Sequence, residues 1–293
     1  MTANKKKLLR YAVISLNLIG RKIVSFAPLF VSRYLGVRGW TRLISRSPKV
    51  QFTANLYGSK YKIHVQGNHA VERLAVQNKP AEHDPFIGLK NLNIEGKTAL
   101  DIGANVGTIS LGLAALGCSK VYSIEPGPLH AKLIDNIQLN KLSDVVVPFK
   151  IGFGEKNGEM FWAEDKNNPG NAHLVNSLDD IDFEKITTKL EVSDFVRVPI
   201  TTLDEFISTV VKGSIDIIKI DVEGYEYAAL VGAQAVIENF RPIFQIEISE
   251  KMLNISGYSP GHIWDFFRSY NYVAYDYRER FYPTYKLKEY SDK

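Results

Sequence analysis

The sequence predicts an α/β fold built on a doubly wound, mostly parallel sheet. A short apolar run that ends at Ile102 is followed at once by a glycine turn and then by an apolar segment of helical length. Further short apolar runs alternate with helical patterns along the rest of the chain. With 293 residues, 45% hydrophobic and 23% charged, the chain can bury one such core and still carry an appendage. We therefore expect a seven-stranded sheet preceded by a basic appendage of helices and a hairpin.

The expected elements can be justified in chain order. Two alternating runs around a turn, Val50–Leu56 and Tyr61–Val65, have the pattern of a hairpin. Strands of the main sheet are expected at 98–102, 121–124, 145–151, 215–222 and 243–248, with a closing hairpin at 272–277 and 281–285. Helices are expected at 106–116, at 128–140, after the capping box that begins at Thr202, and at 260–269. Between them we expect a turn at 152–158, short strands at 160–163 and 196–200, and a polar loop at 164–191 that is too long for a plain connector.

The glycine turn after the first core strand predicts a binding site for an adenosine-containing cofactor. Gly103 and Gly107 let the backbone turn sharply and approach a ligand closely, and the helix that follows presents free N–H groups. Glu125 ends the next apolar run, roughly 20 residues on, where an acid can hold ribose hydroxyls. A nicotinamide fingerprint is disfavoured because Asn105 replaces its second glycine and Thr108 its third. The competing interpretation is a tight turn that binds nothing.

A second sequence segment indicates which class of cofactor-binding protein this is. Residues 215–226 read Ile-Asp-Ile-Ile-Lys-Ile-Asp-Val-Glu-Gly-Tyr-Glu, and Arg-Pro-Ile-Phe-Gln-Ile-Glu follows at 241–247. Together with the glycine turn and the Glu125-Pro126 pair, the stretch from Thr98 to Ile248 resembles the FkbM family of S-adenosylmethionine-dependent methyltransferases. The resemblance implies a class I methyltransferase (Rossmann-like) fold, S-adenosylmethionine as cofactor, and methyl transfer to a hydroxyl of a sugar, glycolipid, polyketide or other secondary metabolite.

Ligands of doubly wound sheets bind beyond the carboxyl ends of the strands. The residues expected to bind the cofactor at that edge are Asp101, Gly103, Ala104, Asn105, Gly107, Glu125, Pro126, Gly152 and Asp221.

Methyl transfer to an alcohol also needs a group that accepts the hydroxyl proton. The candidates are Asp221, Glu223 and Glu247, which follow the fourth and fifth strands, with Asp221 as the first choice. The first two can equally cap the helix that follows them, and all three together could hold Mg²⁺, although the spacing does not require it and we predict no metal. Lys219 is predicted to be structural, and His173 to lie on the surface.

The charge distribution separates an amino-terminal part from the rest. All 13 Lys and Arg residues up to Lys62 precede the first acid, Glu72, so a net charge of +4 for the chain leaves −9 for the part from Glu72 onward. We expect a basic appendage at 1–75 and a methyltransferase domain at 76–293. A single cysteine, Cys118, permits no internal disulfide, which favours the reducing cytoplasm.

Several explanations of the basic segment stay open. Its apolar runs at 11–20 and 23–32 are too short to span a bilayer, but basic amphipathic helices over residues 1–50 could make peripheral membrane contact. The segment could also pack on the catalytic domain or be a transit peptide, and we expect no nucleic-acid binding because no stacking-aromatic module accompanies the charge. The expected partner is thus a small-molecule or glycan acceptor. The alternative function is a membrane-associated binding module that retains the cofactor fold without turnover.

Overall fold

A computed structural model describes residues 50–56, 59–65, 93–165, 173–175 and 192–273. The chain divides into two compact units, Met1–Asn55 with Lys60–Ala81 and Leu56–Ser59 with Glu82–Lys293. Strands β1 (Val50–Leu56) and β2 (Ser59–Val65) pair with each other, which confirms both strands of the expected hairpin. The membrane contact expected for residues 1–50 falls outside the described residues. Among the helices that the structure does describe, none is long and apolar enough to cross a bilayer.

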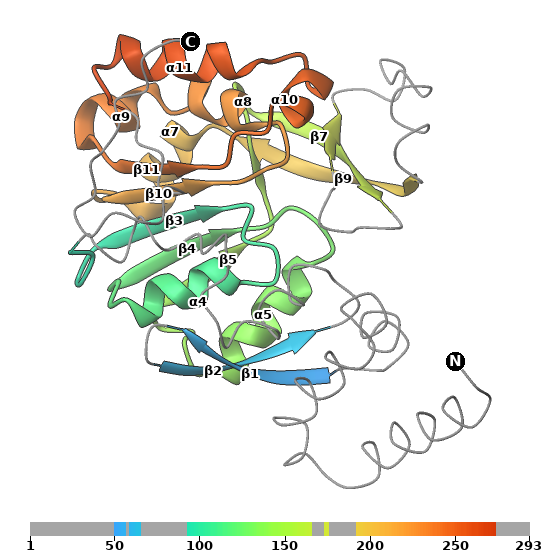
Figure 1. The fold of residues 1–293 in the computed structure, drawn as a ribbon, viewed down its shortest axis with the longest axis vertical. Coiled ribbons are helices and arrows are strands. Elements are labelled where there is room, and N and C mark those ends of the chain that lie inside the picture. Colours follow the sequence, from blue (N-terminus) through green and yellow to red (C-terminus); the bar gives the residue numbers. More distant parts are fainter. Residues whose placement is uncertain (1–49, 57–58, 66–92, 166–172, 176–191, 274–293) are drawn as a thin grey trace, which may run out of the picture. The chain divides into compact units, whose positions relative to one another are not determined.

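The main sheet has five strands in the order β11-β10-β3-β4-β5, and all neighbours are parallel (Figure 1). The strands are β3 (Thr98–Ile102), β4 (Lys120–Ile124), β5 (Val146–Phe149), β10 (Ile217–Ile220) and β11 (Ile243–Ile246). All five lie where the sequence predicts them. The closing hairpin falls almost wholly on 274–293, outside the described residues, so the seven-stranded sheet stays a prediction.

Helices cover both faces of this sheet (Figure 1). Helices α4 (Thr108–Ala115) and α5 (His130–Leu139) cover one face. The other is covered by α7 (Leu203–Phe206) with its π-helical continuation η2 (Ile207–Val211), α8 (Glu226–Val231), α9 (Gln234–Phe240), α10 (Glu250–Ile255) and α11 (Pro260–Ser269). The cap predicted at Thr202 is present, because its side chain accepts the Glu205 N–H at 3.2 Å. At the start of α11, Ser259 forms a capping box with His262.

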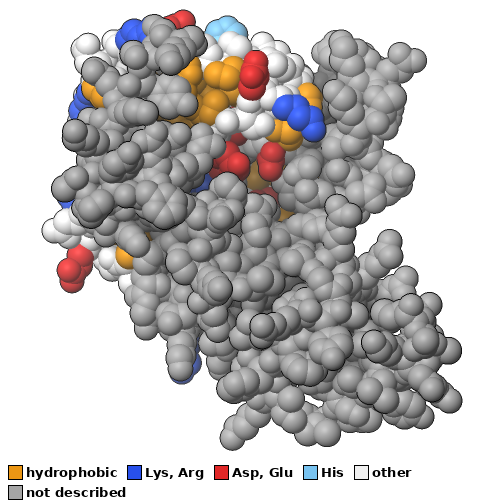
Figure 2. Space-filling view, in the orientation of Figure 1, with side chains coloured by type: hydrophobic (Ala, Val, Ile, Leu, Met, Phe, Trp, Pro, Cys, Tyr) orange, Lys and Arg blue, Asp and Glu red, His pale blue; other side chains and the backbone are white. Residues whose placement is uncertain are grey.

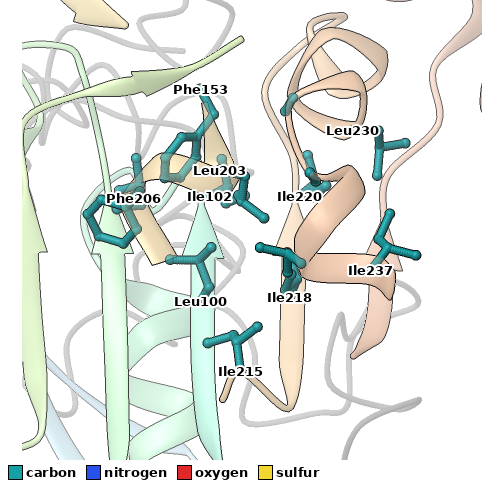
Figure 3. Packing of buried hydrophobic residues seen from close by; sticks show 14 of the residues in the cluster. Leu100, Ile102, Phe153, Leu203, Phe206, Ile215, Ile218, Ile220, Leu230 and Ile237 are labelled. Carbon is teal, nitrogen blue, oxygen red and sulfur yellow. The ribbon is translucent and has the colours of Figure 1, made fainter. Parts of the chain in front are cut away.

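Successive strand residues enter opposite cores, as expected of a sheet buried on both faces. Leu100 and Ile218 point into the cluster shared with the α7–α11 side (Figure 3). Ala99 and Ile217, one residue earlier on each strand, pack on the α4–α5 side. Asp101, two residues after Ala99 on the same strand, points to the α4–α5 side as well. Its carboxylate is therefore buried beneath the glycine turn.

A second sheet of four strands corrects two expectations. Its order is β6-β9-β7-β8, from β6 (Gly152–Phe153), β9 (Val192–Thr201), β7 (Gly158–Asp165) and β8 (His173–Val175). The expected turn at 152–158 therefore begins with a strand, and the expected loop at 164–191 contains β8. The sequence pattern missed β6 because it pairs with Ile200 and Thr201, much later in the chain, and no local periodicity signals such a pairing. It missed β8, which pairs with the nearby β7, because a strand of three residues is too short to show an alternation.

Candidate active site

The turn between β3 and α4 is held close to both neighbouring strands. The N–H groups of Gly103 and Ala104 donate to the carbonyl oxygen of Ile124 at 3.0 and 2.9 Å. Gly103 has a φ of +80°, and a Cβ added to it would come within 1.8 Å of the carbonyl oxygen of Asp221. Only glycine satisfies both the backbone angle and the contact. The turn therefore lies directly against the residue that follows β10.

Glu125 faces this turn from the end of β4. Its Oε2 accepts the N–H of Asn105 at 2.9 Å, and its Oε1 accepts the N–H of Gly127 at 2.8 Å. The side chain is 3% exposed, and this burial raises the pKa of the carboxyl to about 7 although both N–H donors act to lower it. Since a carboxylate can accept about four hydrogen bonds, two acceptor positions remain for a ligand. The glycine turn and the acid predicted to act together are thus in direct contact.

An indole ring covers the turn that follows Glu125. A Cβ added to Gly127 would lie 2.5 Å from two ring atoms of Trp162 and 2.9 Å from Oε1 of Glu125. Trp162 belongs to β7, so the second sheet reaches the turn that follows Glu125. Pro126 between them is buried.

Asp101 lies inside the sheet, below the turn. Its carboxylate is 0% exposed, and its Oδ2 accepts a hydrogen bond from Ser110 at 2.5 Å. Ser110 in turn accepts from Ser123 at 2.7 Å, and the Nζ of Lys219 lies 3.3 Å from the Oδ1 of Asp101. These partners engage both oxygens of Asp101, which the sequence placed among the cofactor-binding residues. The carboxylate therefore supports the turn from within.

Lys219 links this buried network to the loop after β10. Its Nζ donates to the carbonyl oxygen of Gly103 at 3.1 Å and lies 3.4 Å from Oδ2 of Asp221. Burial lowers the pKa of the ammonium, but the carboxylates of Asp221 and Asp101 outweigh that effect and raise it above its ordinary value. Lys219 therefore carries its charge at neutral pH. The sequence predicts a structural role for Lys219 but not these contacts. Because a buried charge needs a partner, a lysine in an otherwise apolar strand is the signal that could have suggested them.

The loop after β10 gathers carboxylates. Burial, followed by the charges of Asp221, Glu247 and Glu226, raises the pKa of Glu223 to about 8. Glu223 also has a φ of +53°, an uncommon conformation for a residue with a side chain. The exposed Glu247 directly follows β11 at this edge, and its N–H donates to the carbonyl oxygen of Ile220 at 3.1 Å. The three predicted proton acceptors thus lie on one edge of the sheet.

Acidic side chains are also visible as a group near the middle of the described face in Figure 2. Within the described part of the chain, no group of three or more His, Cys, Asp or Glu side chains is placed to hold a metal ion. The Mg²⁺ alternative for Asp221, Glu223 and Glu247 therefore gains no support from the geometry.

Glu226 holds the loop in place. It is 3% exposed, and its Oε1 accepts the N–H groups of Val222 and Gly224, both at 3.1 Å. No sequence motif marks Glu226, although an acid in the first turn of a helix is a common backbone acceptor. Asn136 of α5 donates to the carbonyl oxygen of Val106 at 2.8 Å and so fixes the far end of the glycine turn.

Two of the predicted glycines have packing partners that the sequence did not show. Gly152 was expected where a strand of the main sheet ends, but it lies in β6, and a Cβ there would be 2.7 Å from Ile200. The same Cβ would be 4.0 Å from Pro126, so Gly152 connects the second sheet to the turn that follows Glu125. Gly107, with a φ of +92°, is followed by α4 and lies against Leu133.

Comparisons with known proteins support the family resemblance suggested by the segment at 215–226. The profile of the methyltransferase FkbM domain matches residues 101–274. Protein arginine N-methyltransferase 6 of Danio rerio is 36% identical over 58 residues, which are 20% of this chain and 17% of that protein.

Two crystal structures are similar at lower identity. PRMT6-SAH is 17% identical over 60% of this chain and 45% of its own, with a TM-score of 0.35. The T. Thermophilus 16S rRNA N2 G1207 methyltransferase RsmC, in complex with AdoMet and guanosine, is 16% identical over 71% of this chain and 45% of its own, with a TM-score of 0.36. This chain spans less than half the length of each of these proteins.

Proposed function

The chain belongs to the FkbM methyltransferase family, and on that premise we propose that it is an S-adenosylmethionine-dependent O-methyltransferase. The acceptor is a hydroxyl group of a sugar, a glycolipid or a secondary metabolite. The cofactor end of this proposal is supported by contacts between described residues, and the acceptor end by the chemistry of the acidic edge.

The observation that carries the proposal is the contact between the glycine turn and Glu125. The Asn105 N–H and the Glu125 Oε2 are 2.9 Å apart, so a strand end and a helix start meet at one point. The buried carboxylate retains acceptor positions for two hydroxyls of a ribose. Gly103 brings the backbone so close to Asp221 that a methionine chain lying along the turn would reach the acidic edge. These residues fit S-adenosylmethionine.

When bound, the cofactor supplies a methyl group already activated by a sulfonium. The residues of the chain then have to hold an acceptor oxygen in line with that methyl group, about 3–3.5 Å away, and to keep it there. Two sets of contacts restrict the motion of the loop after β10: the ion pair of Lys219 with Asp221, and the hydrogen bonds that Glu226 accepts from the loop backbone. We assign the positioning of the acceptor oxygen to this loop.

In this proposal Glu223 accepts the hydroxyl proton, whereas Asp221, the first choice from the sequence, orients the reactants, and Glu247 lies at the outer margin. A base works best when its pKa is close to the working pH, and the pKa of Glu223, raised to about 8, meets that condition. The side chain of Asp221 is one-third exposed, and its Oδ2 lies 3.4 Å from the ammonium of Lys219. Glu223 thus takes the proton, and Asp221 orients the acceptor or the donor beside it.

Calorimetry tests the cofactor site first. We expect S-adenosylmethionine and S-adenosylhomocysteine to bind the full chain, and Glu125→Ala and Gly103→Ala to weaken both at least tenfold. Binding that neither substitution changes would exclude this site. The matched control is Gly96→Ala, at another positive-φ glycine whose Cβ would meet nothing within 4 Å.

A labelled-methyl assay then separates turnover from binding alone. Purified chain, labelled S-adenosylmethionine and panels of glycans, glycolipids and polyketides should give a labelled product from one panel. Transfer to an amine or a guanidinium would contradict the O-methyl assignment. Cofactor binding without transfer in any panel, together with sedimentation on anionic vesicles, would favour the binding module instead.

A further inference from the structure

Trp162 lies next to the proposed cofactor site, although no sequence motif identifies it as a site residue. Its Cε2 and Cζ2 atoms are both 2.5 Å from the position that a Cβ on Gly127 would take, and Oε1 of Glu125 is 2.9 Å from the same position. The ring therefore packs directly on Gly127, where no side chain would fit, and lies beside the Glu125 carboxylate. This is the carboxylate that we assign to the ribose hydroxyls.

Among the residues that the structure describes, none accepts a hydrogen bond from the indole N–H of Trp162. Its Nε1 is buried and makes no hydrogen bond to any described residue. Folded proteins leave few buried donors unpaired, because each one carries a desolvation cost. An indole can only donate, so the missing partner has to be an acceptor atom. Glu125 is adjacent, but its two oxygens accept from Asn105 and Gly127 instead.

The backbone around Trp162 holds the ring in this place. Trp162 is paired on both sides, with Leu174 of β8 and with Val196 of β9. Met160, two residues earlier on the same face of β7, packs with Leu174, Ile200 and Tyr225. A ring fixed by a strand with two neighbours loses little further freedom when a ligand binds beside it.

We propose that Trp162 binds the nucleoside of the methyl donor, with its ring against the base or the ribose and its Nε1 donating to an acceptor atom there. Ring nitrogens of the base and oxygens of the ribose both offer the lone pair that the indole lacks. This inference rests on the proposed function, since it names a further residue of the same site. It also gives the second sheet a role, because β7 supplies one wall of the nucleoside pocket.

Tryptophan emission tests this directly. The chain has three tryptophans, Trp40, Trp162 and Trp264. In the full chain carrying Trp40→Phe and Trp264→Phe, Trp162 is the only tryptophan and can be excited selectively over the tyrosines. We expect adenosine and S-adenosylhomocysteine to change its emission saturably and methionine to leave it unchanged. The matched control is Trp40→Phe with Trp162→Phe, in which Trp264 on α11 is the remaining tryptophan and its emission should not change.

Affinity supplies the second measurement. Trp162→Phe keeps an aromatic ring but removes the donor, so its Kd for S-adenosylhomocysteine should rise about three- to tenfold at an unchanged melting temperature, the range expected for one lost hydrogen bond. Gly127→Ala keeps the indole but displaces it, and should weaken adenosine binding as well. If Trp162→Phe fails to fold, the emission of the single-tryptophan chain decides alone.

The outcomes distinguish this inference from the proposed function. If calorimetry shows that the wild-type chain binds S-adenosylhomocysteine while Trp162 emission stays constant, the inference is overturned and the proposed function stands. Unchanged affinity in both Trp162→Phe and Gly127→Ala would overturn it in the same way, and would assign the acceptor to water. If the wild-type chain binds no S-adenosylhomocysteine, the proposed function itself fails.

Discussion

Lys219 and Asp101 are register partners on adjacent parallel strands, and their charged atoms are 3.3 Å apart in the interior of the sheet. The two side chains are 5% and 0% exposed. Ser123 is the register partner of Asp101 on the next strand, so a polar row crosses three strands on the face that α4 covers. One end of the row contacts the glycine turn, and Lys219 connects it to Asp221. The cofactor turn and the acidic edge thus share one buried charge system.

Removing the ammonium from this row should destabilise the fold strongly. Lys219→Met leaves two carboxylates without their counter-ion, one of them fully buried. Breaking a buried ion pair by removing one partner typically costs about 3–5 kcal/mol. We expect a loss of that order in the free energy of unfolding, measured with urea at pH 7.

Two controls identify the cause of that loss. Asp101→Asn added to Lys219→Met removes the uncompensated charge and should restore a large part of the stability. Arg268→Ala breaks an exposed ion pair with Asp265 on α11, and should change the free energy of unfolding by no more than about 1 kcal/mol. A double variant as unstable as Lys219→Met would contradict the pairing.

Gly103→Ala should disrupt the contact between the β3 turn and the β10 loop. The added Cβ would meet a backbone oxygen of Asp221 at 1.8 Å, so one of the two segments has to move. Gly96→Ala imposes a similar positive φ, +74°, with nothing within 4 Å, and should cost only about 1–2 kcal/mol. Thermal unfolding of the two variants should show a clearly lower melting temperature for Gly103→Ala; equal melting temperatures would contradict the close approach.

Stability should fall as the pH rises from about 4.5 to about 8. Burial raises the pKa of Glu125 to about 7 and that of Glu223 to about 8, both from 4.5. The folded chain therefore binds these protons more tightly than the unfolded chain, and the stabilisation they give is lost as each folded-state carboxyl ionises. Urea unfolding from pH 5 to pH 9 measures this slope. Glu223→Gln should flatten it between pH 7 and pH 8, and an equally steep profile in that variant would count against the assignment.

Glu226→Ala should loosen the loop that carries the proton acceptors. Its Oε1 is the acceptor for two backbone N–H groups, those of Val222 and Gly224, which would lose their partner. Leaving a buried donor unsatisfied costs about 1–3 kcal/mol. Amide hydrogen exchange should accelerate at Val222 and Gly224 in Glu226→Ala. Glu226→Gln keeps an acceptor oxygen of the same reach and should retain most of the protection.

The sequence by itself determined the five parallel strands, the glycine turn and the acid that faces it. Each depends on information within about 20 residues: an apolar run, a residue that tolerates positive φ, a capping side chain, or the spacing from a turn to the next strand end. Glu125 and Asn105, 20 residues apart, are in contact as that spacing predicts. The acidic edge could be anticipated for the same reason, because parallel strands end on one side.

Only the tertiary structure decided which side chains complete the site. Lys219 reaches the carbonyl of Gly103, 116 residues away, and Trp162 reaches the Glu125 turn from a sheet whose β6 pairs with strand residues much later in the chain. Such contacts depend on strand register and on the packing of separate elements, which local periodicity does not encode. The chain thus carries the cofactor turn in its local sequence, whereas the charge balance beneath it and the indole over Gly127 exist only once the two sheets have come together.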